Sequence, residues 1–235
     1  MKAIILASGI GKRLLPLTKK TAKPLIKLNG KSIIERQIDS ILKFKINEII
    51  VTTGPFTVKI MKLLKEKYRD AKITFVQNPQ YDTTNYIYSL WLTKDHITED
   101  VLLLHGDLVF DEKVLAKIVK AKGNSVLVNK SVKKPEKDFK AIIENGLVKK
   151  IGVEYFTDNS YFSIPIYKIS KKDFLLWMHE IEKEIKNGNL NIYAEDAFNK
   201  ISEEIKLKPV YFKDEVCMEI DTKEDLKIAK TKLKD

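Results

Sequence analysis

The sequence predicts an α/β protein whose sheet is doubly wound, mixed and mainly parallel, of the Rossmann-like type. Short apolar runs alternate with segments of helical periodicity over the first half of the 235-residue chain, which is typical of parallel strands joined by crossover helices. Polar residues hardly interrupt these runs, as expected for strands that helices cover on both faces.

The first half is expected to supply five strands and the helices between them. The clearest helix begins at Ser32, because Ser32 and Glu35 form a capping-box pattern ahead of isoleucines at helical spacing. The predicted strands cover residues 2–7, 47–53, 72–77, 100–105 and 124–129.

The rhythm changes after residue 130, where we expect a small β insert. Residues 140–151 predict a hairpin, since its central Asn145-Gly146 favours a type I′ turn. The remaining predicted elements are a strand at 160–169, helices at 171–187 and 194–204, two short strands within 207–220, and a last helix at 223–233. No repeat or Pro/Gly/Ser-rich linker divides the sequence, so we expect a single domain over residues 1–235.

Composition limits the location and the redox chemistry of the protein. No apolar run approaches the roughly 20 residues needed to cross a bilayer. The apolar start is also too short for a signal peptide, so we expect a cytoplasmic protein with no membrane partner. The single cysteine, Cys217, excludes an internal disulfide and a cysteine zinc cage, and its strand-like surroundings indicate a packing thiol.

The net charge of +11 raises the alternative of a basic nucleic-acid-binding module. Most cations are lysines spread along amphipathic segments, and the arginines are only Arg13, Arg36 and Arg69. No basic block is interleaved with aromatic residues, so solvated helix faces explain most of the excess and no nucleic-acid partner is expected. An anionic substrate would still be attracted by the field.

The turn after the first predicted strand carries the most specific motif of the chain, residues 8–14, Ser-Gly-Ile-Gly-Lys-Arg-Leu. Its two glycines allow backbone N–H groups to close on an anion, while Arg13 and Lys23 supply positive charge. The P-loop pattern fails because Leu6 stands where its first glycine belongs, and the dinucleotide fingerprint fails because Leu14 replaces its third glycine. The motif therefore indicates a phosphate site of another kind.

Further candidate residues follow the other predicted strands, and ligands of open α/β sheets bind at these carboxyl ends. Gly54, Asn78 and the segment His105-Gly106-Asp107 all stand at such positions. Asp107 offers a carboxylate to a divalent cation, and Asp221 near the end of the chain offers a second one, which suits Mg²⁺ together with phosphate oxygens. The three histidines lack paired metal-ligand spacing, and we interpret His105 as a packing residue.

These motifs together resemble a known family. The pattern G-x-G-x-R-L-x-P-L-T followed by K-P-L resembles the signature of nucleotidyltransferases that make sugar nucleotides and CDP-alcohols. Residues 77–92 are similar to the N-x-x-Y-x-x-x-N-x-x-Y-S-L pattern of the CTP:phosphocholine cytidylyltransferase (LicC-like) group. The residues that agree with that pattern are Asn78, Tyr81, Asn85, Tyr88 and Ser89.

The resemblance implies attack of a phosphate or phosphonate oxygen on the α-phosphorus of a nucleoside triphosphate, with release of pyrophosphate. Lys23, Arg13 and Asp107 would be catalytic, and Mg²⁺ would be the cofactor on Asp107 and Asp221. A nucleotide-binding part would cover about residues 1–130 and an acceptor-binding part about 131–222. The implied nucleotide-binding residues are Leu6, Ala7, Ser8, Gly9, Gly11, Lys12, Arg13, Gly54, Asn85, Ser89 and Gly106.

The acceptor is less closely defined than the nucleotide. The candidate acceptor-binding residues are Lys23, Tyr193, Glu195, Asp196 and Lys140. Aromatic faces suit a quaternary ammonium, whereas a primary amine also needs carboxylate acceptors, and the chain offers both. The phosphocholine group carries a tryptophan where this chain has Ala194, so phosphoethanolamine and 2-aminoethylphosphonate stay open beside phosphocholine.

The sequence thus favours a cytidylyltransferase that uses CTP and a small phosphorylated or phosphonate amino-alcohol, for cell-surface glycan or lipid precursors. We expect a monomer or homodimer. The alternative is a sugar-1-phosphate nucleotidylyltransferase with CTP, UTP or dTTP as donor, and the nucleic-acid-binding module is a distant third.

Overall fold

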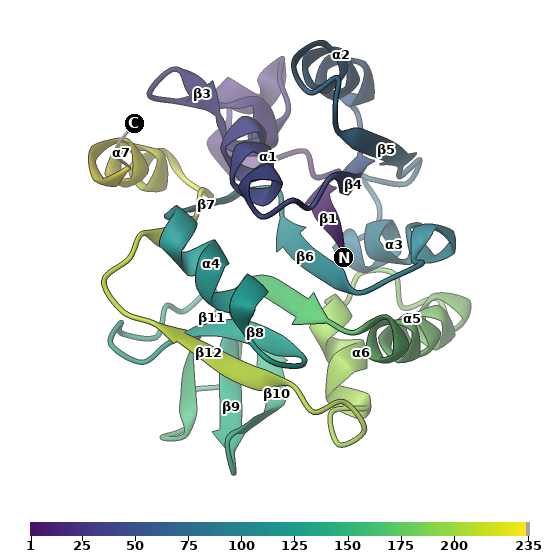
Figure 1. Ribbon diagram of the computed structural model, residues 1–235, viewed down its shortest axis with the longest axis vertical. Coiled ribbons are helices and arrows are strands. Elements are labelled where there is room, and N and C mark those ends of the chain that lie inside the picture. Colours follow the sequence, from purple (N-terminus) through teal and green to yellow (C-terminus); the bar gives the residue numbers. More distant parts are fainter. Residues whose placement is uncertain (234–235) are drawn as a thin grey trace.

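A nine-stranded mixed sheet forms the centre of the computed structural model, which describes residues 1–233 (Figure 1). Its parallel part has the order β6, β1, β4 and β5. These four strands are β1 (Lys2–Ala7), β4 (Glu48–Thr53), β5 (Lys72–Gln77) and β6 (Val101–His105). Because they run in one direction, their carboxyl ends and the turns after them meet at one edge of the sheet.

The second half of the sheet is mainly antiparallel. Strand β11 (Ser160–Ile169) pairs with β6 and continues into the predicted hairpin, so the β insert extends the main sheet. β12 runs parallel to β8 at the outer side of β11. The strands of this half are β8 (Ser125–Asn129), β9 (Lys140–Glu144), β10 (Leu147–Gly152), β11 and β12 (Lys208–Phe212). The predicted mixed, mainly parallel fold class is confirmed.

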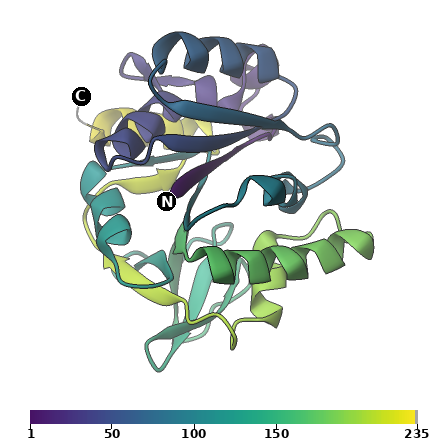
Figure 2. The same ribbon diagram turned by 45° about the vertical axis from the view of Figure 1, so that its right-hand side comes forward.

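Helices cover both faces of the sheet, as the turned view shows (Figure 2). Each face of the sheet has its own hydrophobic core, and neighbouring residues of β1 point into different ones. Ile5 packs in the core with α1, α2 and α4, whereas Ile4 packs in the core with α3, α5 and α6. A third, smaller core joins α7 to Leu14 and Ile220. The helices are α1 (Ile33–Lys43), α2 (Thr57–Lys67), α3 (Tyr86–Trp91), α4 (Glu112–Lys120), α5 (Lys171–Lys186), α6 (Ala194–Lys200) and α7 (Lys223–Lys232).

Local signals explain where several elements begin and end. The capping box predicted at Ser32 is present, because the Ser32 hydroxyl accepts from the Glu35 N–H and the Glu35 carboxylate accepts from the Ser32 N–H. A small hairpin, β2 (Lys27–Leu28) and β3 (Lys31–Ser32), precedes α1 and was not predicted. Four 3₁₀ turns complete the described part of the chain: Lys12–Leu14, Leu17–Lys19, Lys23–Leu25 and Lys94–His96.

One unpredicted strand has the largest effect on the site. β7 (Leu108–Phe110) follows β6 after a two-residue turn and pairs with β13 (Cys217–Glu219). The two short strands near the end of the chain are therefore not partners, since β12 joins the main sheet and β13 joins β7. The β7–β13 pairing carries Asp221 to the carboxyl end of β6, where the Ile220 N–H donates to the Asp107 carbonyl at 3.0 Å.

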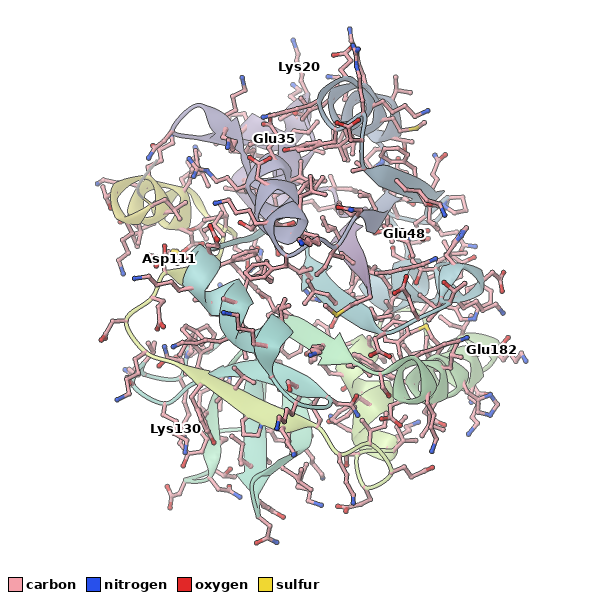
Figure 3. The ribbon with its side chains drawn as sticks, in the orientation of Figure 1. Lys20, Glu35, Glu48, Asp111, Lys130 and Glu182 are labelled. Atoms are coloured by element: carbon pink, nitrogen blue, oxygen red, sulfur yellow. The ribbon has the colours of Figure 1, made fainter. Side chains whose placement is uncertain are left out.

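The outer surface carries the charge excess in a dispersed form. Charged side chains project on every side of the outline (Figure 3), as expected for solvated helix faces. Within residues 1–233, none of the helices combines the length and the apolar character that crossing a bilayer requires.

Candidate active site

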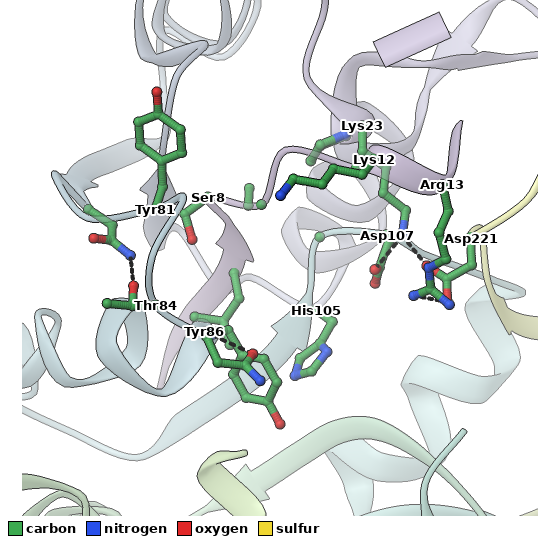
Figure 4. A pocket seen from close by; sticks show the side chains of 18 residues that line it. Ser8, Lys12, Arg13, Lys23, Tyr81, Thr84, Tyr86, His105, Asp107 and Asp221 are labelled. Atoms are coloured by element: carbon green, nitrogen blue, oxygen red, sulfur yellow. Dashed lines mark hydrogen bonds and ion pairs between the residues drawn. The ribbon is translucent and has the colours of Figure 1, made fainter. Parts of the chain in front are cut away.

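A cavity of about 340 Å³ lies at the edge where the parallel strands end (Figure 4). The loop after β1, the Gly106-Asp107 turn after β6 and the segment from Asn78 to Tyr86 line it, together with Asp221 from the end of the chain. The predicted gathering of strand-end residues is therefore seen in the structure. Of the predicted nucleotide-binding residues, those that line the cavity are Leu6, Ala7, Ser8, Gly9, Gly11, Lys12, Arg13, Asn85 and Gly106.

Glycines are required where backbones come close around the loop after β1. Gly11 has φ +70° in the left-handed region, and its carbonyl accepts a hydrogen bond from the Thr18 hydroxyl at 2.8 Å. A Cβ on Gly106 would stand 2.7 Å from the Leu6 carbonyl oxygen, and a Cβ on Gly54 would collide with the Ser8 carbonyl. Gly54 thus supports the loop from behind and does not line the cavity.

The cationic side chains converge on two carboxylates. Lys23, only 8% exposed, donates from Nζ to Asp107 Oδ2 at 2.8 Å and to Asp221 Oδ1 at 2.5 Å. Arg13 pairs with the other oxygen of Asp221 at 2.8 Å, while most of its side chain stays exposed. Lys12 points into the open space of the cavity (Figure 4), where it is available to an anion.

The charges of this cluster stabilise one another. Burial would lower the pKa of Lys23, but the carboxylates of Asp107 and Asp221 outweigh it and raise that pKa above its ordinary value. Burial acts on Asp107 in the opposite sense, and the charge of Lys23 nevertheless holds the pKa of this carboxyl below its ordinary value. Both groups are therefore ionised at neutral pH. Burial lowers the pKa of His105, so its imidazole is neutral there.

The carboxylates also fit a divalent cation. Asp107 Oδ1 is buried and has no hydrogen-bond partner, which leaves one oxygen of this carboxylate free to ligate. Two groups of side chains within the described residues bring ligand atoms within 4.8 Å of one another: His105, Asp107 and Glu219, and Asp138, Glu219 and Asp221. Burial and the neighbouring carboxylates raise the pKa of Glu219 well above its ordinary value, so added positive charge would favour its ionised form.

A buried hydrogen-bond network supports the opposite wall of the cavity. The Asn78 side chain is 1% exposed and donates to Ser89 at 2.9 Å and to Thr84 at 3.1 Å. These bonds hold the segment from Asn78 to Thr84 against α3. The Ser89 hydroxyl lies 2.6 Å from the Ser8 hydroxyl and does not line the cavity. The structure thus places Ser89 behind Ser8, as support for the glycine loop.

The predicted acceptor residues lie in different surroundings. Glu195 is 1% exposed and accepts hydrogen bonds from the Tyr86 and Tyr167 hydroxyls, so its carboxylate is enclosed beneath the cavity wall. Asp196 caps α6 by accepting from the Tyr193 N–H at 2.8 Å. The Tyr193 ring lies against Phe139 and Tyr86, with centroids 5.1 and 6.0 Å away.

Lys140 does not reach the cavity. It is fully buried, and its Nζ donates to the carbonyls of Pro135, Glu136 and Asp138 at 2.7 to 3.2 Å. The charge also lies over the Phe156 ring at 4.1 Å. All three donors of the ammonium are used within its own loop.

Sequence reasoning missed several cavity residues. Tyr81, Thr84 and Tyr86 line the cavity beside Asn85, and His105 lines it at the end of β6. The strand-end rule did place His105 at this edge, but its side chain was assigned to packing. The packing interpretation of His105 accounts for its ring, which lies edge-on to Tyr86 at 4.5 Å, but leaves its buried Nε2 without a partner.

Comparison with known proteins places the chain among nucleotide-handling enzymes. The family model described as nucleotidyl transferase matches residues 2–148. The chain is 40% identical over 110 residues to choline-phosphate cytidylyltransferase of Streptococcus pneumoniae, and 33% identical over 138 residues to CTP:phosphoglutamine cytidylyltransferase of Campylobacter jejuni. It is 31% identical over 121 residues to CMP-5'-(3-aminopropyl)phosphonate synthase of Streptomyces rubellomurinus.

These sequence similarities cover part of each protein. The alignments include 47%, 56% and 52% of this chain, and 46%, 53% and 19% of the respective relatives. Similarity of fold extends further: CTP:phosphocholine cytidylyltransferase of S. pneumoniae superposes with a TM-score of 0.80 over 99% of both chains at 23% identity. The inositol-1-phosphate CTP transferase of T. maritima gives 0.79 over 95% of this chain and 90% of that one, also at 23% identity.

Proposed function

The chain belongs to the nucleotidyl transferase family, and from that premise we propose that it is a Mg²⁺-dependent cytidylyltransferase. It would transfer CMP from CTP to a small phosphorylated or phosphonate amino-alcohol and release pyrophosphate. The observation that carries this proposal is the buried Lys23 held between Asp107 and Asp221, beside the unpartnered Oδ1 of Asp107. Such a cluster suits phosphate oxygens together with a divalent cation.

The proposed reaction needs no covalent intermediate. An oxygen of the acceptor phosphate or phosphonate forms a bond to the α-phosphorus of CTP. The bond from that phosphorus to the oxygen bridging to the β-phosphate breaks, and pyrophosphate leaves with the electron pair. Catalysis of this kind depends on alignment and on cations placed where negative charge develops.

The residues of the cavity divide these tasks. The backbone N–H groups of the loop from Gly9 to Arg13, with Lys12 and Arg13, would hold the β- and γ-phosphates. Lys23 would contact the α-phosphate and the incoming acceptor, because it lines the cavity and its Nζ lies between the carboxylates of Asp107 and Asp221. Asp107 and Asp221 would hold Mg²⁺, which when bound supplies positive charge against the α-phosphate.

CTP is favoured as the donor by sequence similarity together with the local pattern. Three relatives named as cytidylyl- or CMP-transferring enzymes are 31% to 40% identical to about half of the chain. The Asn78 network fixes Ser8 and the loop up to Asn85, so a base at this wall would meet a rigid surface. Gly54 backs this wall without space for a side chain, which limits how far the loop can yield to a purine.

The proposal is tested by pyrophosphate release with Mg²⁺. CTP, UTP, dTTP, ATP and GTP are each combined with phosphocholine, phosphoethanolamine, 2-aminoethylphosphonate and glucose 1-phosphate, with acceptor-free reactions as controls. We expect release with CTP and at least one amino-alcohol acceptor. Release only with glucose 1-phosphate would replace the proposal by the sugar-phosphate alternative. No release in any combination, with salt-sensitive binding of nucleic acid, would favour the basic binding module.

A further inference from the structure

Three buried polar side chains form a hydrogen-bonded row at the wall of the cavity. The row runs from Asn78, directly after β5, through Ser89 of α3 to Ser8 in the loop after β1. The three residues are 1%, 1% and 5% exposed, so water hardly competes for the bonds between them. Ser8 lies on the side of the cavity opposite Asp107 and Asp221 (Figure 4). A base bound against Ser8 would therefore lie away from the groups proposed to hold phosphates and metal.

The surroundings of the Asn78 amide fix its orientation. Its Oδ1 accepts from the backbone N–H of Gln80 at 2.8 Å, and a backbone N–H can only donate. The Nδ2 group therefore faces Thr84 and Ser89, to which it donates at 3.1 and 2.9 Å. Thr84 agrees with this orientation, because its own proton is donated to the Gln80 carbonyl at 2.7 Å and its oxygen is left to accept. Both protons of the amide are thus used, and Ser89 receives one of them.

The donation continues from Ser89 to Ser8. Since the Ser89 oxygen accepts from Asn78, its own proton needs an acceptor. Within residues 1–233, the Ser89 hydroxyl has no hydrogen-bond partner other than Asn78 and the Ser8 hydroxyl, which lies 2.6 Å away. Ser89 must then donate to Ser8, because the reverse direction would leave a buried proton unsatisfied. The proton of Ser8 has no acceptor among the described residues, and Ser8 lines the cavity.

We propose that Ser8 is a specificity-determining residue that donates its hydroxyl proton to N3 of cytosine; this rests on the proposed function and concerns the separation of CTP from UTP. The exocyclic N4 of cytosine is a donor, so a donating hydroxyl has to face N3 or O2. Of these two atoms only N3 differs in kind between the pyrimidines, since it accepts in cytosine and carries a proton in uracil. Uracil would thus place a second donor against Ser8, at the cost of an unmade buried hydrogen bond.

Asn78 is then a positioning residue for this contact. It fixes the direction of donation along the row and acts on the base through Ser89 and Ser8. A site built to hydrogen-bond one partner rejects an analogue that cannot pair with it more strongly than an apolar pocket does. The direction of two buried hydrogen bonds would therefore set the choice between two bases of nearly equal size.

The test is equilibrium binding of CTP, UTP and 3-deaza-CTP, with Mg²⁺ and without an acceptor. 3-Deaza-CTP keeps the shape of cytosine and has C–H in place of N3. For the unmodified protein we expect CTP to bind at least about tenfold more tightly than either analogue. Ser8→Ala should weaken the binding of CTP by about tenfold and leave the three nucleotides within about threefold of one another, because the donor is gone.

Asn78→Asp tests the direction of donation. The two side chains have the same shape, but the carboxylate can only accept where Nδ2 donated. Ser89 would then donate to the new carboxylate and Ser8 to Ser89, so that Ser8 would offer only lone pairs to the base. We expect the preference for CTP over UTP to fall by at least about tenfold in this variant. The added negative charge acts on both triphosphates alike and cancels in the ratio.

Ser89→Ala and Thr93→Val form a matched pair. Each removes a buried hydroxyl in α3 or just beyond its end, and Thr93 donates to the Leu90 carbonyl at 2.7 Å without lining the cavity. Ser89→Ala should lower the preference for CTP over UTP by about fivefold, because the Ser8 hydroxyl can then turn either way. Thr93→Val should leave the preference within about twofold. An equal loss in both variants would mean that loosening of α3 decides the preference, and the assignment of Ser8 would be wrong.

Other outcomes separate the Ser8 contact from the proposed function. Equal binding of CTP and 3-deaza-CTP to the unmodified protein would overturn the N3 contact, whatever reaction the protein catalyses. A preference for CTP that survives Asn78→Asp would overturn the direction of donation. Selective binding of CTP that Ser8→Ala removes, without pyrophosphate release with any acceptor, would support the contact while rejecting the proposed transfer. Absence of binding of all three nucleotides would reject both.

Discussion

Within residues 1–233, the N-terminal and the C-terminal half each bury one lysine, and the two lysines are satisfied in different ways. Lys23 in the N-terminal half donates to carboxylates of Asp107 and Asp221, which come from distant parts of the chain. Lys140 in the C-terminal half donates to three carbonyls of the loop just before it. Carboxylates can exchange a lysine for a metal ion or a substrate, whereas backbone carbonyls belong to the loop that the lysine holds. A buried lysine therefore indicates a catalytic or binding role only when its partners are groups that can also bind a metal ion or a substrate.

The largest effect should follow from removing an exchangeable partner. Asp107→Asn should lower Mg²⁺-dependent pyrophosphate release by about 10³-fold, because it removes charge where the metal and Lys23 meet. The fold should persist, since the side chain borders the cavity and belongs to none of the apolar cores. Steady-state kinetics over a Mg²⁺ titration measures the loss, with the exposed Asp70→Asn as control. Turnover close to normal would reject the metal assignment.

Removal of Lys23 tests the same cluster from its cationic side. Lys23→Met should lower turnover by about 10²-fold or more and destabilise the metal-free protein by about 2 kcal/mol, because two carboxylates lose a shared buried cation. Added Mg²⁺ should restore much of this stability, since it supplies the missing charge. Thermal unfolding with and without Mg²⁺ measures both effects. A loss of stability that Mg²⁺ does not reverse would mean that Lys23 is structural in the way Lys140 is.

Lys140 provides the opposite expectation. Lys140→Met should destabilise the protein by about 2 kcal/mol, because three buried carbonyls lose their donor, and Mg²⁺ should not reverse this loss. The KM for the acceptor should change by less than about threefold, as expected for a lysine that lies away from the cavity. Denaturant unfolding and acceptor titrations give the two values. A large rise in acceptor KM at unchanged stability would instead assign Lys140 to the acceptor phosphate.

Strands with a clear local pattern could be predicted from the sequence, whereas strands defined by distant pairing could not. Strands of the N-terminal half lie in mostly apolar runs with clear ends, so β1 and β5 were predicted to the residue. β7 is only three residues long and follows β6 after two residues, so no local pattern separates it. Its partner β13 lies more than 100 residues further on, and such pairing leaves no local trace in one sequence.

The residues of the candidate site also differ in whether local sequence or tertiary packing determines their position. Residues placed by the glycine loop and by strand ends, such as Gly11 and Asp107, line the cavity as predicted, because backbone geometry fixes their position. Ser89 and Glu195 lie on helices, and packing turned both side chains to buried partners. The position of Glu219 near Asp107 was not predicted, because it depends on the unpredicted β7–β13 pair. Side-chain direction on a helix depends on tertiary contacts that spacing alone does not reveal.

The smallest expected effect concerns Glu35, whose charge should contribute to stability and not to catalysis. Glu35 lies in the first turn of α1 and does not line the cavity. Burial would raise its pKa, but hydrogen bonds from Lys67 and Ser32 outweigh this and lower the pKa to about 2. Because the folded pKa is depressed, the stabilisation is fully present above the ordinary pKa of about 4.5 and is lost as the pH falls toward 2. Glu35→Gln should therefore cost about 1 kcal/mol at pH 7 and progressively less near pH 3.

Urea unfolding of both proteins at pH 7, 4.5 and 3 gives this difference directly, and turnover at pH 7 should be unchanged. A difference in stability that is constant with pH would mean that Glu35 contributes through packing and not through its charge. A loss of turnover would show that the α1 cap is coupled to the cavity. Charged groups outside the cavity would then also affect catalysis. If both expectations hold, the exposed Lys67 stabilises the fold through Glu35, and of the two lysines buried within residues 1–233 only Lys23 has partners that a substrate can replace.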